Sequence, residues 1–151
     1  MDELDRRILQ LLQEDGRAPF TQLAKKVGLS ETAVRFRYKN LVEQGVVRTV
    51  SIVDPYALDF QAPALINIAV EPGKLEAVAR QVADLPETAY LVVTLGPYDL
   101  LAEVYCRNLK HLTELVTHRL QVIPGVRSTE TSMVAQVYKL SYRWAPSPDE
   151  N

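Results

Sequence analysis

The spacing of apolar residues changes at Gly45, and this change limits the possible folds more than any other feature of the chain. Before Gly45, apolar residues recur every three or four positions, which is the period of α-helices with one buried face. After it, runs rich in β-branched residues alternate with two helical stretches. The 151 residues are 47% hydrophobic, which is enough for two small cores. The sequence therefore predicts an α+β protein with an all-helical N-terminal part.

Three helices are expected in the first 45 residues. Glycines mark their expected ends at Gly16, Gly28 and Gly45. Ser30 lies where its hydroxyl can accept a hydrogen bond from the first turn of the third helix. Apolar residues at helical spacing form the expected buried faces: Leu4, Ile8, Leu11 and Leu12, then Phe20, Leu23, Ala24 and Val27, then Val34, Tyr38 and Leu41. The second and third helices, joined at Gly28-Leu29-Ser30, make a helix-turn-helix.

The chain after Gly45 is predicted to start with a strand that acts as a hinge. Residues 46–53 are rich in β-branched side chains and end at Asp54-Pro55, a turn signal. Beyond it we expect strands at 63–71, 89–95, 99–107 and 126–139, and helices at 74–85 and 109–121. This βαββαβ order is that of a ferredoxin-like sheet. The expected divisions are 1–50 for the helix-turn-helix, 51–62 for the linker, 63–140 for the ferredoxin-like domain and 141–151 for a tail.

Two helices can cover only one face of this sheet. Their expected buried stripes are Leu75, Val78, Ala79 and Val82 in one, and Leu109, Leu112, Val116 and Leu120 in the other. The strand at 100–106 has apolar residues on both faces, with Leu101 and Tyr105 opposite the even-numbered residues and Glu103 as the exception. An uncovered apolar face predicts a protein partner, most simply a second copy of the chain.

Positive charge is concentrated between Arg17 and Arg48, although the whole chain has a net charge of −2. This stretch holds seven basic residues against two acidic ones. A basic patch on an otherwise acidic protein attracts phosphates locally. An ordinary solvated surface is the alternative, and charge alone does not decide between the two.

The helix-turn-helix and the basic patch together predict binding to double-stranded DNA. The third helix is expected to turn Thr32, Arg35, Phe36 and Lys39 outward. Arg35 can donate two hydrogen bonds to a guanine, and Phe36 can touch a thymine methyl group; packing within the protein is the alternative for Phe36. Phosphate contacts are expected from Arg17, Lys25, Lys26 and Ser30, and Arg37 is also included among the DNA-binding residues.

Motifs in both halves of the chain resemble one known family. The N-terminal half contains Asp15-Gly16-Arg17, Val27-Gly28-Leu29-Ser30 and Gly45-Val46-Val47. The C-terminal half contains Gly96 before Tyr98-Asp99-Leu100, and Pro124-Gly125-Val126 before Thr129 and Thr131. With this spacing, Asp2 to Lys139 resembles the Lrp/AsnC (feast/famine) transcription regulators.

The resemblance implies a winged-type DNA-binding domain, an effector domain, and homodimers that assemble into octamers with an amino-acid effector bound between dimers. It puts the effector site at Leu95, Gly96, Tyr98 and Asp99, and near Thr129 and Thr131. A glycine lets backbone amides approach a carboxylate, and Asp99 could meet an ammonium group. The alternatives are a plain hairpin turn at Gly96-Pro97 and an Asp99 that, as a strand-start residue, bonds its own loop.

Other classes of protein fit the sequence less well. No nucleophile, general base and orienting acid recur at a meaningful spacing, so an enzyme is not expected. His111 and His118 are seven residues apart, too far to share a metal as an i, i+4 pair would, and neither a metal nor a cofactor is expected. A metabolite-binding or structural oligomer is the other alternative, but it leaves the basic helix-turn-helix unexplained.

The remaining sequence signals concern the environment of the chain. Cys106 has no partner for an intramolecular disulfide and is expected to be a buried small hydrophobe. Five carboxylates within the first 20 residues, with no long apolar run, argue against a signal peptide or a spanning helix. A cytoplasmic protein is expected.

Overall fold

The computed structural model describes residues 1–142, which divide into two compact units. Unit 1 comprises residues 1–52 together with the described residues from Lys139 onward, and unit 2 comprises residues 53–138. The tail expected at 141–151 lies, from residue 143, outside the described residues. No helix within the described part of the chain is long and apolar enough to cross a membrane.

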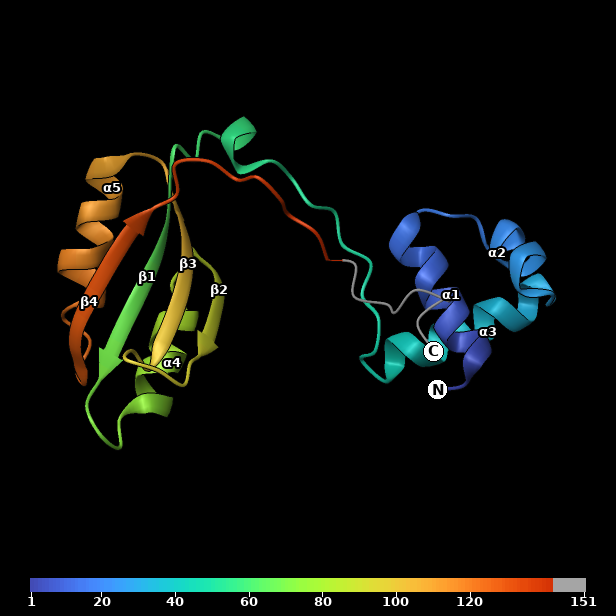
Figure 1. Ribbon diagram of the computed structural model, residues 1–151, viewed down its shortest axis with the longest axis horizontal. Helices are drawn as coiled ribbons and strands as arrows, with labels where there is room; N and C mark the ends of the chain where they lie inside the picture. Colours follow the sequence, from blue (N-terminus) through green and yellow to red (C-terminus); the bar gives the residue numbers. More distant parts are fainter. Residues whose placement is uncertain (143–151) are drawn as a thin grey trace. The chain divides into compact units, whose positions relative to one another are not determined.

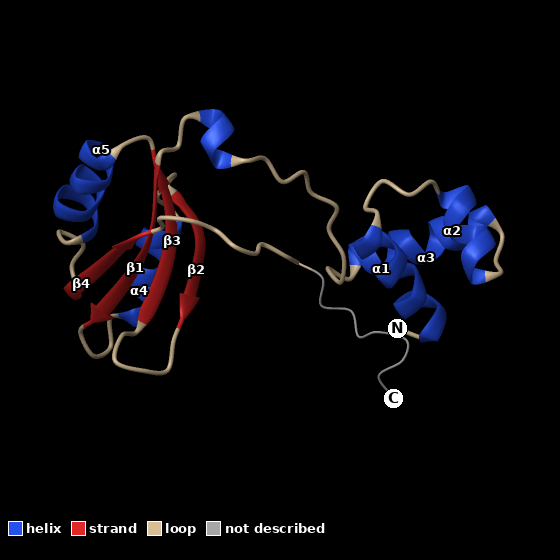
Figure 2. Ribbon diagram, turned by 45° about the horizontal axis from the view of Figure 1, so that its top comes forward, coloured by secondary structure: helices blue, strands red, loops and turns tan. Residues whose placement is uncertain are grey.

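Unit 1 is built from three helices, α1 (Glu3–Glu14), α2 (Phe20–Val27) and α3 (Glu31–Glu43) (Figure 2). α2 ends at Gly28 in the left-handed conformation, and the Ser30 hydroxyl accepts the Ala33 N–H at 3.2 Å at the start of α3. These two signals fix the turn between α2 and α3, and the expected helix-turn-helix is confirmed. The buried core holds one apolar face of each helix: Ile8, Leu11, Leu23, Ala24 and Val34.

The strand predicted at 46–53 is wrong. The described backbone there joins no sheet, and Val50, Ile52 and Val53 are all more than half exposed. β-branched residues favour a pleated surface packed against neighbouring strands, and this stretch has no such neighbour in the structure. No strand, and hence no wing, follows α3 in the described residues of unit 1.

Unit 2 has the expected βαββαβ order. A 3-10 helix (Pro55–Leu58) precedes β1 (Ala62–Val70), α4 (Leu75–Ala83), β2 (Thr88–Val93), β3 (Leu100–Cys106), α5 (Leu109–Glu114), a π-helical segment (Leu115–Leu120) and β4 (Val126–Met133). The sheet is antiparallel with the order β2-β3-β1-β4. The predicted α+β, ferredoxin-like fold is therefore confirmed, although β4 ends at Met133 rather than continuing to residue 139.

α4 and α5 lie on the same side of the sheet (Figure 1). Val78 and Val82 of α4 are fully buried there, as predicted. In the second helix Leu109 is 61% exposed, against prediction, whereas Leu115 and Leu120 are both fully buried. In a π-helix the backbone hydrogen bonds join residues five apart, so such residues lie on nearly the same face. The π-helical segment therefore lets both Leu115 and Leu120 reach the core.

No helix formed by residues 53–138 covers the other face of the sheet. The register places Leu101 between Asn67 and Val92, and Glu103 between Leu65 and Tyr90. Leu65 and Tyr90 are exposed, and Leu101 is partly exposed. This open face is the uncovered apolar surface that the strand pattern predicted.

Candidate nucleic-acid interface and ligand site

The outward face of α3 presents four side chains that the sequence placed there. Val34 and Leu41 point into the core of unit 1, so the opposite side of the helix faces solvent. Phe36 is 64% exposed, which excludes the alternative that it packs within the protein. Thr32, Arg35 and Lys39 are exposed with it. We call Thr32, Arg35, Phe36 and Lys39 the outward face.

Each cation of the outward face has a carboxylate one helical turn away. Arg35 donates from Nε and Nη2 to one Glu31 oxygen at 2.9 and 2.6 Å. The Lys39 ammonium lies 3.6 Å from a Glu43 oxygen. Because all four side chains are well exposed, solvent screens both pairs, and they orient the side chains more than they stabilise the fold.

Arg37 departs from its expected role. It lies on the same helix, but its guanidinium pairs with Asp2 at 2.7 Å and with Asp5 at 2.8 Å, both at the start of α1. A hydrogen bond from Arg37 adds to that from the Asp5 backbone N–H in lowering the pKa of Asp2. Arg37 therefore joins α3 to α1, and the structure does not place it on the outward face.

The expected phosphate-contacting residues flank the outward face. Arg17, Lys25 and Lys26 are exposed and form no ion pair with another residue in the described range 1–142. The Ser30 hydroxyl already accepts a hydrogen bond as the α3 cap, but it retains its own proton to donate. Among residues 1–142, the side chains expected to contact phosphate thus comprise three cations without an ion pair and one capping hydroxyl.

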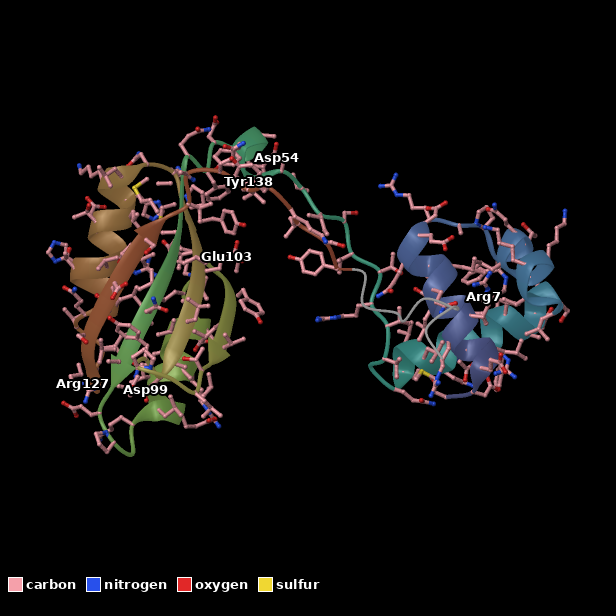
Figure 3. The ribbon with its side chains drawn as sticks, in the orientation of Figure 1. Arg7, Asp54, Asp99, Glu103, Arg127 and Tyr138 are labelled. Carbon is pink, nitrogen blue, oxygen red and sulfur yellow. The ribbon has the colours of Figure 1, made fainter. Side chains whose placement is uncertain are left out.

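The loop between β2 and β3 holds four of the expected effector residues. Leu95 is fully exposed at its tip, and Gly96 is also exposed. Asp99 lies at the end of the sheet where β3 begins (Figure 3). Its carboxylate accepts the Val70 N–H of β1 at 2.7 Å, while its backbone carbonyl accepts the Thr94 N–H across the loop at 2.9 Å.

The two expected threonines and this loop meet different faces of the sheet. Thr129 and Thr131 pair with Ile68 and Ile66, whose side chains are buried under the helices. Thr129 accepts a hydrogen bond from the Gln121 amide at 2.9 Å on that side. Glu130, between them, points to the open face and accepts a hydrogen bond from the Tyr98 hydroxyl. Both that bond and desolvation raise the pKa of Tyr98.

Glu130 is the residue of this region that the sequence reasoning missed. The alternation along β4 was the available signal, because residues 129 and 131 share one face and residue 130 takes the other. The loop is therefore connected to β4 through Tyr98 and Glu130, not through the threonines.

A separate cluster of charges lies at the start of β2. Glu87 Oε1 accepts one hydrogen bond from Arg119 Nη1 at 2.6 Å and lies 3.0 Å from the His111 ring nitrogen Nε2. Burial alone would raise the pKa of Glu87, but the hydrogen bonds from His111 and Arg119 lower it below its ordinary value. Burial raises the pKa of the neighbouring Cys106 thiol to about 11. Cys106 is thus the buried, unreactive residue that the sequence predicted.

Comparison with known protein families assigns both units. Residues 1–42 match the AsnC-type helix-turn-helix domain, and residues 63–144 match the Lrp/AsnC ligand-binding domain. The chain belongs to the Lrp/AsnC family. It is a DNA-binding transcriptional regulator with a ligand-binding domain, and not an enzyme.

Relatives and solved structures of the Lrp/AsnC family match this chain over almost its whole length. An HTH-type transcriptional regulator of Pyrococcus furiosus is 36% identical over 143 residues, which cover 94% of this chain and 97% of that protein. The regulator FL11 of Pyrococcus abyssi is 36% identical over 140 residues, 92% of each chain. The structure of Escherichia coli AsnC matches with a TM-score of 0.85 at 26% identity, over 97% of this chain and 99% of AsnC.

One structural neighbour contains a ligand. A transcriptional regulator of Neisseria meningitidis, solved in complex with L-Met, matches with a TM-score of 0.84 at 26% identity over 94% of each chain. The amino acid belongs to that protein's complex. For the present Lrp/AsnC regulator, the matching ligand-binding domain is the shared feature.

Proposed function

We propose that this Lrp/AsnC regulator binds DNA sequence-specifically through the outward face of α3 and adjusts its binding to an amino acid held between dimers. The observation that carries the proposal is the exposed set Thr32, Arg35, Phe36 and Lys39 on the second helix of a helix-turn-helix. A guanidinium, a hydroxyl and an aromatic ring on one face supply both hydrogen-bonding and apolar contacts to base edges. The compartment we propose is the cytoplasm, where this DNA partner is accessible.

Phosphate contacts come, in this proposal, from the residues that flank the outward face. Arg17, Lys25 and Lys26 supply charge without a competing carboxylate, and Ser30 supplies one hydroxyl donor. Such contacts add affinity that is insensitive to sequence and sensitive to salt. We leave Arg37 out of this set because its charge is already engaged by α1.

The effector site we propose is the loop Leu95–Asp99 together with Glu130, which meets Tyr98 on the open face. Thr129 and Thr131 face the helix-covered side of the sheet and are left out of the proposal. The exposed loop around Gly96 offers backbone donors to a carboxylate, and Glu130 offers a negative charge to an ammonium group. Asp99 fixes the loop to β1, and the Tyr98 hydroxyl occupies one Glu130 oxygen, so a ligand's ammonium group would compete with Tyr98 for that carboxylate. The complex of the Neisseria meningitidis regulator with L-Met supports an amino acid as the ligand.

Two copies of the chain pack, in our proposal, through the open face of the sheet, and dimers assemble further into octamers. The open face is rich in apolar side chains, and burying it would remove Leu65, Tyr90 and Leu101 from water. Leu101→Glu should therefore shift the sedimentation of the purified protein toward the monomer. A wild-type protein that sediments as a monomer at micromolar concentration would contradict this part of the proposal.

Selection of bound sequences from random DNA, with and without a panel of L-amino acids, tests the function as a whole. We expect an enriched, roughly palindromic sequence, and a change in its occupancy with at least one amino acid. Arg35→Ala should lose about 1–3 kcal/mol on the enriched sequence and relax one base pair, whereas Lys25→Ala should weaken binding to all sequences alike. Equal losses on specific and random DNA for Arg35→Ala would refute its base-contacting role.

A further inference from the structure

One edge and one flat face of the Arg35 guanidinium contact other residues of unit 1. Its side edge, Nε and Nη2, is occupied by one Glu31 oxygen at 2.9 and 2.6 Å. One flat face lies over the Phe20 ring, with Cζ 4.7 Å from the ring centroid. The end edge, formed by one N–H of Nη1 and the second N–H of Nη2, has no hydrogen-bond partner among residues 1–142. Arg35 therefore offers a single pair of parallel donors.

Phe20 is itself fixed by the packing between α2 and α3. Its ring lies 5.3 Å from the Tyr38 ring at an angle of 58°, an arrangement that favours contact between the two rings. The Tyr38 hydroxyl is hydrogen-bonded to the Thr49 hydroxyl at 3.0 Å. The ring that contacts Arg35 therefore comes from α2, and it packs against Tyr38 of α3, which is hydrogen-bonded to the segment after α3.

We propose that Glu31 and Phe20 are positioning residues that set base selectivity by leaving only the end edge of Arg35 available. Two parallel donors on one edge match the O6 and N7 acceptors of guanine in the major groove. The inference rests on the proposed role of Arg35 in contacting DNA. Glu31 also keeps a negative charge beside the guanidinium, so a backbone phosphate competes poorly with guanine for Arg35.

The same helix contains a matched control pair. Glu43 faces Lys39 at the same i, i+4 spacing, with the charged atoms 3.6 Å apart, and within the described residues neither one forms an ion pair or hydrogen bond with Arg35. Glu31→Ala and Glu43→Ala each remove one negative charge from α3. Both variants should therefore bind random DNA more tightly by a similar factor, whereas only Glu31→Ala should change base selectivity.

The experiment measures competition between the selected operator and the same operator with its preferred guanine replaced, for a set of purified full-length variants. Glu31→Ala should lower the preference for guanine at one base pair about two-fold, the scale of an exposed i, i+4 pair. Phe20→Leu should lower it about two- to five-fold, the scale of an exposed cation–π contact. Phe20→Tyr keeps the ring and should restore the wild-type preference. Thermal melting of each variant checks that unit 1 remains folded.

Arg35→Gln separates failure of this inference from failure of the proposed function. If Arg35→Gln leaves the base preference unchanged, Arg35 does not contact a base, and both statements fall. If Arg35→Gln removes the preference while Glu31→Ala and Phe20→Leu retain the wild-type value, Arg35 contacts the base without help and the positioning role is wrong. A lower preference for guanine with Glu31→Ala but not with Glu43→Ala supports the positioning role, even if Phe20→Leu proves too unstable to measure.

Discussion

Replacing Gly125 with alanine tests how closely β4 packs against α4. Gly125 has φ +103°, a conformation that residues with a Cβ rarely adopt. A Cβ there would lie 2.7 Å from the Lys74 Cβ and 3.1 Å from Cγ2 of Val78. Gly73 has φ +78° with no atom within 4 Å of such a Cβ, so Gly73→Ala meets the same kind of backbone strain without the collision.

Comparing the two variants separates the cost of crowding at Gly125 from the cost of backbone strain. Backbone strain costs about 1–2 kcal/mol in each, and crowding against a packed side chain adds about 1–3 kcal/mol for Gly125→Ala alone. We therefore expect the free energy of unfolding to fall by about 2–5 kcal/mol for Gly125→Ala and about 1–2 kcal/mol for Gly73→Ala.

Urea unfolding followed by circular dichroism measures both losses, at one fixed protein concentration because self-association would add to the apparent stability. The difference between the variants should exceed about 1 kcal/mol, or about 4 °C in Tm for a unit of this size. Equal losses would mean that the Lys74 side chain and the turn yield freely, and the packing argument for Gly125 would be refuted.

Three further predictions concern unit 2. Cys106 should resist iodoacetamide near neutral pH until the protein unfolds, because burial raises its pKa to about 11; rapid labelling of native protein would contradict this. Leu115→Ala should cost about 2–5 kcal/mol in urea unfolding, whereas Leu109→Ala should cost little because its side chain is 61% exposed. The lowered pKa of Glu87 means that its contribution to stability is complete above its ordinary pKa and is lost as pH falls through the lowered value. Glu87→Gln should therefore flatten the fall of Tm below about pH 4.3, and an unchanged slope would show that Glu87 adds no pH dependence.

Local signals predicted the fold wherever the neighbours in sequence decide the structure. Ser30 was expected as a cap and accepts the Ala33 N–H, because an N-cap needs only the residues of the next turn. The predicted strand at 46–53 failed because a strand needs a partner that the local sequence does not encode. Leu115 was missed because a regular α-helical period running from Leu112 to Leu120 assigns the buried position to Val116, whereas in the π-helical segment Leu115 is buried and Val116 only partly so.

For the candidate sites, the sequence predicted which helix or loop carries each residue but not which residues its side chain contacts. Arg35 and Arg37 are two positions apart, and their charges are indistinguishable in the sequence. Asp2 and Asp5, more than 30 residues away, turn only Arg37 inward. Asp99 was expected to meet a ligand or to bond its own loop; its backbone carbonyl does bond the loop at Thr94, but the sequence did not predict that its carboxylate bonds the β1 backbone. Such partners depend on tertiary packing, which residue spacing along one helix or loop does not reveal.

The carboxylates beside Arg35 and Lys39 separate two properties of the regulator between its helices. Because Glu31 and Glu43 offset the positive charges of α3, the outward face is close to electrically neutral. In the proposed mode of binding, sequence-independent attraction to DNA then comes mainly from Lys25 and Lys26 at the end of α2 and from Arg17 before it. We therefore expect substitutions of the uncharged residues Thr32 and Phe36 to change the preferred operator with little effect on sequence-independent DNA binding, and substitutions of Lys25 and Lys26 to do the reverse.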